Sequence, residues 1–409
     1  MQKNNENLCK VRTITAFLSL TRDKDTWASS LYKASTLFIK LSESLMSDNY
    51  EVQSIRIVTN PFGEYLDTNS IDSAKKDLLY LSGLLDVFNK LGLRIRFAIG
   101  EAKNEHEIGL VPELIRSFGD LSNVCVNIDC DDGVLNNDLI RSSAEAVLNI
   151  SKLVPRGEGN FNFTVNFNCE PHIPYFPASY HEKSMPDCFV IGLETPDLLV
   201  DVVKNTREKN ADRSHKVFFT TCYSAMSKAL QENVDNINHI VESIKGQHDF
   251  FFAGIDSSAA PSKNCASLVE LYELMGVEYF GAAGTIEVSS LLTKVFKSIS
   301  NVKLKGFSGL MLAPTEDTGL AAGTIRGDFD IRALLTYSAV CGIGLDTVPI
   351  PGDTSMEKIS ALMRDTGTMA YRLNKPLTVR LFPIPGSPVG EQTQFESVDL
   401  CNCAIMAVP

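Results

Sequence analysis

The sequence predicts an α/β fold built on a mainly parallel sheet. Strand-like apolar runs alternate with helix-like runs from one end of the 409-residue chain to the other. Such alternation is typical of parallel sheets flanked by helices. No Ser/Gly-rich linker or low-complexity tract interrupts it. One large barrel, or a pair of fused half-barrels, therefore fits better than two independent domains. We expect a flexible tail over residues 1–10 and a single α/β domain over 11–409.

The individual elements follow from local patterns. Apolar runs bounded by turn residues predict strands. Apolar residues spaced at i, i+3, i+4 and i+7 predict amphipathic helices. The predicted strands are 11–20, 53–59, 93–99, 123–128, 161–168, 188–193, 250–256, 305–313, 341–348, 377–384 and 400–408. The predicted helices include 27–47, 71–91, 225–245, 264–275 and 285–299, and a capping box of Thr354 and Glu357 predicts one more.

Composition and charge exclude several classes of protein. The chain is 44% hydrophobic and 22% charged, which is ordinary for a globular protein. Its net charge of −12, without a long basic run, argues against nucleic acid and anionic membranes as partners. No apolar run reaches the roughly 20 residues that span a bilayer, and the polar N-terminus lacks the apolar core of a signal peptide. The ten scattered cysteines indicate reduced, mostly buried thiols, so we expect a cytoplasmic protein.

Segment 341–354 is the strongest candidate for a functional strand end. Its apolar run stops at a Pro-Gly turn, with Asp346 and Asp353 near that turn. Many α/β proteins place their active sites at the carboxyl ends of strands, before a helix whose first N–H groups attract anions. We therefore expect Asp346 to be an acid/base residue, and Gly352, Asp353 and Thr354 to bind an anion. The alternative is an ordinary strand–helix turn.

Two further strand exits carry polar residues. Glu316 and Asp317 follow the apolar run 305–313, and adjacent carboxylates can act as a general base or bind a hard divalent cation. In segment 281–287, glycines precede a predicted helix and let a ligand approach its N–H groups. The alternatives are a solvated acidic loop in the first case and a turn capped by Thr285 in the second. The binding candidates in the second segment are Gly284, Thr285 and Glu287.

Arginines and one mixed polar segment complete the candidates. A buried guanidinium needs a carboxylate of the protein, such as Asp346 or Glu316, or an anionic ligand that matches its planar fork. Segment 166–172 combines Cys169, Glu170 and His172, residue types found in nucleophilic catalysis, but a polar strand exit is the alternative. We take Asn166 in this segment as a binding candidate. The strand arginines are Arg12, Arg56, Arg96 and Arg380, of which Arg12 and Arg380 are substrate-binding candidates.

Four ordered motifs in the C-terminal third resemble a known family. They are Gly-Phe-Ser-Gly at 306–309, Thr-Glu-Asp-Thr-Gly at 315–319, the segment 341–354, and Arg-Leu-Phe-Pro-Ile-Pro-Gly at 380–386 with Val389-Gly390. In this order they closely resemble the uncharacterised family called domain of unknown function 711. The likeness covers about residues 250–409 well, the first strand at 12–15 weakly and the middle poorly.

The resemblance implies a particular fold but does not imply radical chemistry. The family is similar in fold to pyruvate formate-lyase, which implies a ten-stranded barrel of two five-stranded halves, with helices outside and the site inside. Radical chemistry is not implied, because the terminal Arg-Val-x-Gly-aromatic motif is absent and Cys341 therefore has no radical to receive. Cys341 stays among the catalytic candidates. Where many members have Gly-x-His-Gly-Thr, this chain has Ala283 in place of the His.

The leading hypothesis is an enzyme that uses non-radical acid/base chemistry. It would be a lyase, isomerase or hydrolase acting on a small anionic or polar metabolite inside the barrel. We expect Glu316, Asp317, Asp346, Asp353 and Arg380 to converge on one cavity. Glu316, Asp317 and Asp346 are the candidate ligands if a divalent metal binds. The alternative, favoured by Ala283, is an inactive metabolite-binding or regulatory protein on the same scaffold, and a third hypothesis is a scaffold in an assembly. A homodimer is left open.

Overall fold

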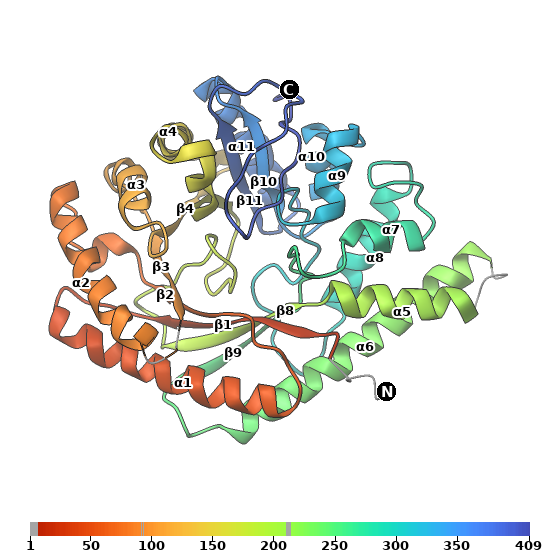
Figure 1. The fold of residues 1–409 in the computed structure, drawn as a ribbon, viewed down its shortest axis with the longest axis horizontal. Helices are drawn as coiled ribbons and strands as arrows, with labels where there is room; N and C mark the ends of the chain where they lie inside the picture. Colours follow the sequence, from red (N-terminus) through yellow and green to blue (C-terminus); the bar gives the residue numbers. More distant parts are fainter. Residues whose placement is uncertain (1–6, 91, 93, 210–213) are drawn as a thin grey trace.

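The computed structural model describes residues 7–90, 92, 94–209 and 214–409. Within them the chain has a mixed α/β fold, with a nine-stranded sheet toward the middle and helices around it (Figure 1). The sheet comprises β1 (Lys10–Leu18), β2 (Ile55–Thr59), β3 (Ile95–Glu101), β4 (Asn123–Ile128), β7 (Phe163–Phe167), β8 (Cys188–Glu194), β9 (Phe251–Asp256), β10 (Gly344–Pro351) and β11 (Leu377–Ile384). A separate small hairpin consists of β5 (Cys130–Asp131) and β6 (Val134–Leu135).

The sheet is parallel in its centre and changes direction twice. Its order is β10-β11-β7-β4-β3-β2-β1-β8-β9. The five central strands β1, β2, β3, β4 and β7 run parallel to one another. Strand β8 pairs antiparallel with β1, and β11 pairs antiparallel with β7. Since β9 is parallel to β8 and β10 to β11, the two pairs at the edges run opposite to the central strands.

Amphipathic helices cover one face of the sheet. On α1, for example, Leu31, Phe38 and Leu41 are fully buried while Tyr32 is exposed, as the apolar spacing predicts. None of the helices in the described part of the chain is long and apolar enough to cross a membrane. The α-helices are α1 (Trp27–Ser47), α2 (Ile71–Lys90), α3 (Glu105–Phe118), α4 (Asn137–Leu153), α5 (Pro196–Lys209), α6 (His215–Ser243), α7 (Leu268–Leu274), α8 (Thr285–Lys297), α9 (Thr318–Arg326), α10 (Ile331–Ser338) and α11 (Met356–Arg372). Short 3-10 segments are η1 (Lys24–Thr26), η2 (Phe62–Glu64) and η3 (Pro155–Asn162).

The opposite face of the sheet, called the inner face below, carries polar side chains. Ile55 and Ile57 of β2 belong to the main apolar core, whereas Val58 belongs to a separate cluster. Because successive side chains on a strand point to opposite faces, Arg56 shares the inner face with Val58. The connection between β7 and β8 packs on this face: the Thr15 hydroxyl donates to the carbonyl of Pro174 at 2.9 Å.

Two of the predicted strands are not regular strands in the structure. Segment 305–313 makes one isolated bridge, at Leu310, and another lies just before it, at Leu304. A regular ladder does not form, because the buried Asp256 carboxylate accepts the N–H groups of Phe307 and Ser308 that it would need. Segment 400–408 likewise has one isolated bridge, between Gln392 and Ala404.

The last long helix begins later than its predicted cap, and two residues of the predicted tail belong to the packed structure. The N-cap of α11 is Ser355, which accepts the N–H of Lys358, whereas the Thr354 hydroxyl donates to the carbonyl of Pro351 at 2.7 Å. At the other end, Cys9 is fully buried and β1 starts at Lys10. The predicted tail therefore overlaps ordered structure at these positions, and its residues 1–6 lie outside the described residues.

Candidate functional site

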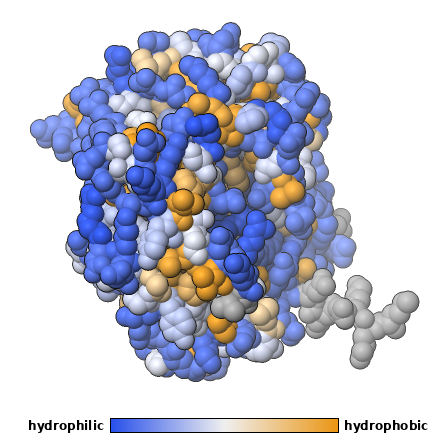
Figure 2. Space-filling view, turned by 60° about the vertical axis from the view of Figure 1, so that its left-hand side comes forward, coloured by the Kyte–Doolittle hydropathy of each residue, from blue (hydrophilic) through white to orange (hydrophobic). Residues whose placement is uncertain are grey.

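A cavity of about 650 Å³, called the main cavity below, gathers the strand arginines. Arg12 of β1, Arg56 of β2, Arg96 of β3 and Arg380 of β11 all line it. The face of the molecule in Figure 2 is hollowed, with hydrophobic side chains beside the hollow. Four strands of the sheet thus place a guanidinium in one cavity, which is the convergence that would serve an anionic ligand.

Arg380 joins two carboxylates in the wall of this cavity. Its Nε donates to Oδ1 of Asp346 at 2.6 Å, and its Nη2 donates to Oε1 of Glu316. Its Nη1 donates to the carbonyl of Phe161 at 3.3 Å, and the guanidinium lies 5.0 Å from the Phe161 ring centroid. The exposed fractions of the side chains are 5% for Arg380 and Asp346 and 15% for Glu316. The structure therefore brings together three of the five residues that we expected to converge.

The local fold explains why this triad forms. Asp346 and Arg380 lie on the adjacent parallel strands β10 and β11, where Leu345 pairs with Val379. Glu316 lies on the loop that follows the isolated bridge at Leu310. Burial and the nearby charge of Asp346 raise the pKa of Glu316, while Arg380 opposes this rise. A carboxyl group with a raised pKa is better matched to proton transfer near neutral pH.

Arg56 is buried in the opposite wall. The residue is 8% exposed, its Nε donates to Oγ of Ser54 at 3.2 Å, and its guanidinium carbon lies 4.9 Å from the Phe176 ring centroid. Among the described residues no carboxylate forms an ion pair with Arg56. Burial, together with the nearby charges of Arg12 and Arg96, lowers the pKa of Arg56 to about 9.

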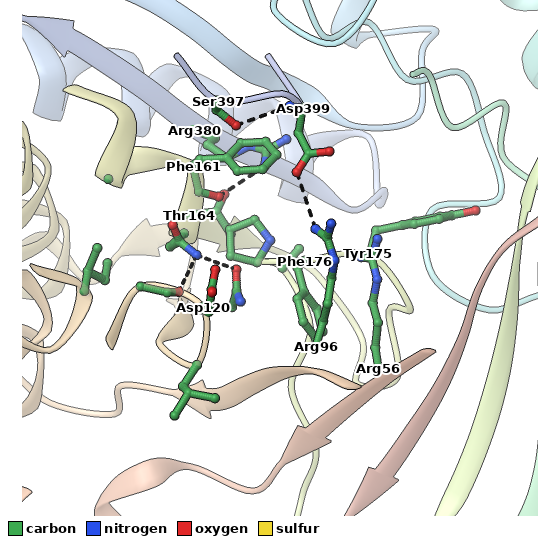
Figure 3. A pocket seen from close by; sticks show the side chains of 18 of the residues that line it. Arg56, Arg96, Asp120, Phe161, Thr164, Tyr175, Phe176, Arg380, Ser397 and Asp399 are labelled. Carbon is green, nitrogen blue, oxygen red and sulfur yellow. Dashed lines mark hydrogen bonds and ion pairs between the residues drawn. The ribbon is translucent and has the colours of Figure 1, made fainter. Parts of the chain in front are cut away.

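The two neighbouring arginines do have acidic partners. Nη1 of Arg96 lies 3.5 Å from Oδ2 of Asp399, and Nη1 of Arg12 lies 3.6 Å from Oε2 of Glu194. In Figure 3, Arg56 and Arg96 rise side by side from the sheet, next to Phe176 and toward the part of the pocket that holds Asp399. This wall therefore carries more positive than negative charge.

Asp317 takes part in helix capping and does not line the main cavity. Its carboxylate accepts the hydroxyl of Ser267 and the N–H of Leu268 at the start of α7. It also accepts the N–H groups of Gly319 and Leu320 in the first turn of α9. Four donors occupy a carboxylate that is 1% exposed. We expected Asp317 to act beside Glu316, but the backbone turns the two adjacent side chains in different directions.

Cys341 and the residues after β10 also lie away from the main cavity. The buried Cys341 borders a separate crevice, and its carbonyl accepts a hydrogen bond from Nζ of Lys375. The N–H of Gly352 donates to the carbonyl of Ile384 at 3.0 Å, and Asp353 is exposed. Together with Thr354, these residues form the strand–helix turn that was the alternative interpretation.

The residues of segment 281–287 likewise form a capped helix start outside the main cavity. Gly284 is the N-cap of α8 with a positive φ of 104°, a conformation that glycine adopts readily. Thr285 accepts the N–H of Gly281 at 3.0 Å and donates to the carbonyl of Ala282 at 2.7 Å. Glu287 is exposed, with an oxygen 3.7 Å from His215. None of these side chains lines the main cavity.

Asn166 lies beside a second cavity, of about 540 Å³, near the carboxyl ends of β3, β4 and β7. Its Nδ2 donates to Oδ1 of Asn127 at 2.9 Å and to the carbonyl of Ala178 at 3.0 Å. The nearby Cys169 thiol donates to two carbonyls, and burial raises its pKa to about 12. His172 contacts His181 instead, at 3.2 Å between ring nitrogens. The residue types in 166–172 therefore do not form a nucleophilic site.

Aromatic residues of the main cavity were missed in the sequence. Tyr175 and Phe176 come from the connection between β7 and β8 and line the cavity. The signal was the length of that connection, because long loops without regular structure in a compact fold are commonly functional. Phe161, which lies against Arg380, gave no signal of its own beyond preceding β7.

The described residues hold no group of three or more His, Cys, Asp and Glu side chains that could bind a metal ion. Of the three predicted ligands, Glu316 and Asp346 lie together, and Asp317 faces the two helix starts. The guanidinium of Arg380 supplies positive charge to the two carboxylates that remain.

Comparison with known proteins gives a family without an assigned activity. The family model described as Uncharacterised ACR (DUF711) matches residues 3–396. A UPF0210 protein of Leuconostoc mesenteroides is 26% identical over 408 residues, covering 94% of this chain and 88% of the relative. A UPF0210 protein of Pyrobaculum aerophilum is 29% identical over 265 residues, covering 63% of this chain but 56% of the relative. The chain thus spans a little over half the length of this second relative.

Proposed function

The chain belongs to the Uncharacterised ACR (DUF711) family, and we propose from its site that it is an enzyme acting by non-radical acid/base chemistry. Its substrate is a small anionic or polar metabolite bound in the main cavity. The observation that carries the proposal is the buried Glu316–Arg380–Asp346 triad, which faces an arginine-rich wall across the cavity. The reaction class is that of a lyase, isomerase or hydrolase.

In this proposal Glu316 exchanges a proton with the substrate. Burial raises its pKa above the ordinary value of a glutamate, the direction that favours proton exchange nearer neutral pH. Arg380 and Asp346 are positioning residues: Arg380 holds the Glu316 carboxylate through one hydrogen bond and is itself held by Asp346. Arg12, Arg56 and Arg96 supply the positive charge that attracts an anion.

The proposed scaffold is a ten-stranded barrel similar to that of pyruvate formate-lyase. Five parallel strands followed by oppositely directed pairs support this arrangement. A tenth strand would come from the segment near 302–311, which bridges β9 through Ile255 and Leu304 and accepts the N–H of Gly342 at the carbonyl of Leu310. Such a strand would lie between β9 and β10 and join the two edges of the sheet.

A turnover assay tests the proposed function. The purified protein is incubated with a cell metabolite extract, and small molecules are followed by untargeted mass spectrometry. We expect at least one anionic metabolite to be consumed by the natural protein and left untouched by Glu316→Gln, which keeps the shape of the side chain but cannot take up a proton at this group. Glu43→Gln, on the exposed side of α1, is the matched control and should retain activity. Equal consumption by Glu316→Gln would contradict the assigned role.

A further inference from the structure

We propose that the substrate is a short organic acid that also carries a hydroxyl or ammonium group. The carboxylate binds Arg56, and the hydrogen-bond donor faces Glu316. This inference rests on the proposed function for the role of Glu316, and it adds the chemical class of the substrate.

The first step is the unsatisfied fork of Arg56. Within the described part of the chain, Nε of Arg56 donates to Ser54, but no hydrogen bond is made by Nη1 or Nη2. Phe176 lies against the guanidinium at 4.9 Å. Arg56 lines the main cavity although the residue is 8% exposed. A buried guanidinium that lacks a carboxylate is costly, and two free parallel N–H donors match a carboxylate in a bidentate arrangement.

The second step is the charge that surrounds Arg56. Glu194, the partner of Arg12, is also contacted by Lys10, with 3.4 Å between Nζ and Oε1. Asp399, the partner of Arg96, lies at 3.5 Å in a pair whose side chains are about two-fifths exposed. Neither acid reaches Arg56, so the positive charge of Arg56 remains for a ligand to neutralise.

The third step is the opposite wall, which favours a hydrogen-bond donor. Among the described residues, Arg380 binds Oε1 of Glu316 and Oδ1 of Asp346, while the second oxygen of each carboxylate accepts no hydrogen bond. Two carboxylates share one guanidinium there, so the wall is acceptor-rich. Glu316 and Arg56 both line the main cavity. A ligand that places a carboxylate on one wall and a hydroxyl or ammonium on the other satisfies both.

A matched set of four-carbon probes and inorganic phosphate test this class by isothermal titration at constant ionic strength. The four-carbon probes are butyrate, 2-hydroxybutyrate, 2-aminobutyrate and 2-amino-1-butanol, and sodium chloride is the reference. We expect 2-hydroxybutyrate or 2-aminobutyrate to bind more tightly than butyrate, and 2-amino-1-butanol, which lacks a carboxylate, not to bind. Binding of phosphate without binding of the acids would overturn the carboxylate assignment, as would no binding by any probe.

Variants separate a binding role from a structural one. Arg56→Met should weaken binding of the acids by about tenfold or more, since hydrogen bonds to charged groups are lost. It should also raise the melting temperature of the ligand-free protein, because it removes a buried charge that has no partner. Arg332→Met, on an exposed position of α10, is the control and should change neither. Unchanged binding, or a less stable ligand-free protein, with Arg56→Met would overturn the proposal.

The failure of this inference is distinguishable from failure of the proposed function. Glu316→Gln leaves Arg56 in place, so it should still bind butyrate as the natural protein does. If the acids bind through Arg56 but no metabolite is turned over, the protein binds this class of compound as a ligand and the proposed enzymatic function is wrong. If Glu316→Gln abolishes turnover while Arg56→Met binds normally, the function stands and the class falls.

Discussion

Replacing Arg380 with Met isolates the two carboxylates of the triad. Arg380 contacts both Glu316 and Asp346, and the side chains of these acids are 15% and 5% exposed. Removing one partner of a buried ion pair costs about 3–5 kcal/mol of folding free energy, because it leaves an uncompensated charge. We therefore expect Arg380→Met to lower the free energy of unfolding by about that amount near pH 8.

The loss should depend on pH in a defined direction. Without the guanidinium, burial and the nearby charge of Asp346 hold the folded pKa of Glu316 above its unfolded value. A raised folded pKa favours the folded state at low pH, and this contribution is lost as pH rises through the folded pKa. The penalty should thus be smaller at pH 5 than at pH 8, by about 1 kcal/mol or more, since one pKa unit corresponds to about 1.4 kcal/mol.

Urea unfolding followed by circular dichroism at pH 5 and pH 8 measures both effects. The triple variant Arg380→Met, Glu316→Gln and Asp346→Asn is the control. It should recover most of the lost stability, because replacing a whole buried ion cluster by uncharged groups is often nearly neutral. A loss below about 1 kcal/mol at both pH values, or a triple variant no more stable than the single one, would refute the reasoning.

Three further predictions concern the scaffold. Asp317→Ala should lower the free energy of unfolding by about 2–4 kcal/mol, since it removes caps from two helices, while titration of 2-hydroxybutyrate should give an unchanged affinity; a weaker affinity would return Asp317 to the site. Gly309→Ala should lower the urea midpoint, because a Cβ there would lie 2.9 Å from Cα of Gly342 and backbone cannot give way cheaply; an unchanged midpoint would count against this packing. Burial lowers the pKa of His172 to about 3 and of His181 to about 4. As pH falls below about 6.5, these histidines therefore become protonated in the unfolded chain before they do in the folded one, and the free energy of unfolding should decrease between pH 6.5 and 4 by up to about 1.4 kcal/mol per pH unit for each histidine. A variant with both histidines replaced by Gln that loses stability equally steeply in acid would contradict this assignment.

Much of the fold follows from local sequence patterns. The bounds of β4, β11 and α1 agree with the predicted ranges 123–128, 377–384 and 27–47, because strong apolar periodicity and clear turn residues mark them. Segment 305–313 was predicted as a strand for the same reason. The N–H groups of Phe307 and Ser308 donate instead to Asp256, a residue about fifty positions earlier that no local pattern connects to this segment.

The site could be predicted where a residue lies on a strand, because its position along the strand determines the face of the sheet to which its side chain points. Asp346 and Arg380 lie on strands whose alternation places their side chains on the inner face, so their convergence follows from the fold. Asp317 is adjacent to Glu316 in sequence, but a loop and a helix start have no such alternation. The Asp317 side chain points toward the start of α7, a helix about fifty residues earlier in the chain, and its carboxylate caps that helix.

The importance of Arg56 required tertiary structure. The sequence shows four strand arginines but not which of them has a carboxylate partner. The partners of Arg12 and Arg96 are Glu194 and Asp399, which are distant in sequence. Only the assembled cavity leaves Arg56 as the member of the set without an ion pair among the described residues.

The position of a bound acid tests the account most directly. The measurement is a crystal structure of the protein grown with 2-hydroxybutyrate. We predict the ligand in the main cavity, with its carboxylate on the Nη atoms of Arg56 and its hydroxyl within hydrogen-bond distance of Glu316. A ligand found instead in the second cavity beside Asn166, or a main cavity without ligand at a concentration that saturates binding in solution, would contradict it.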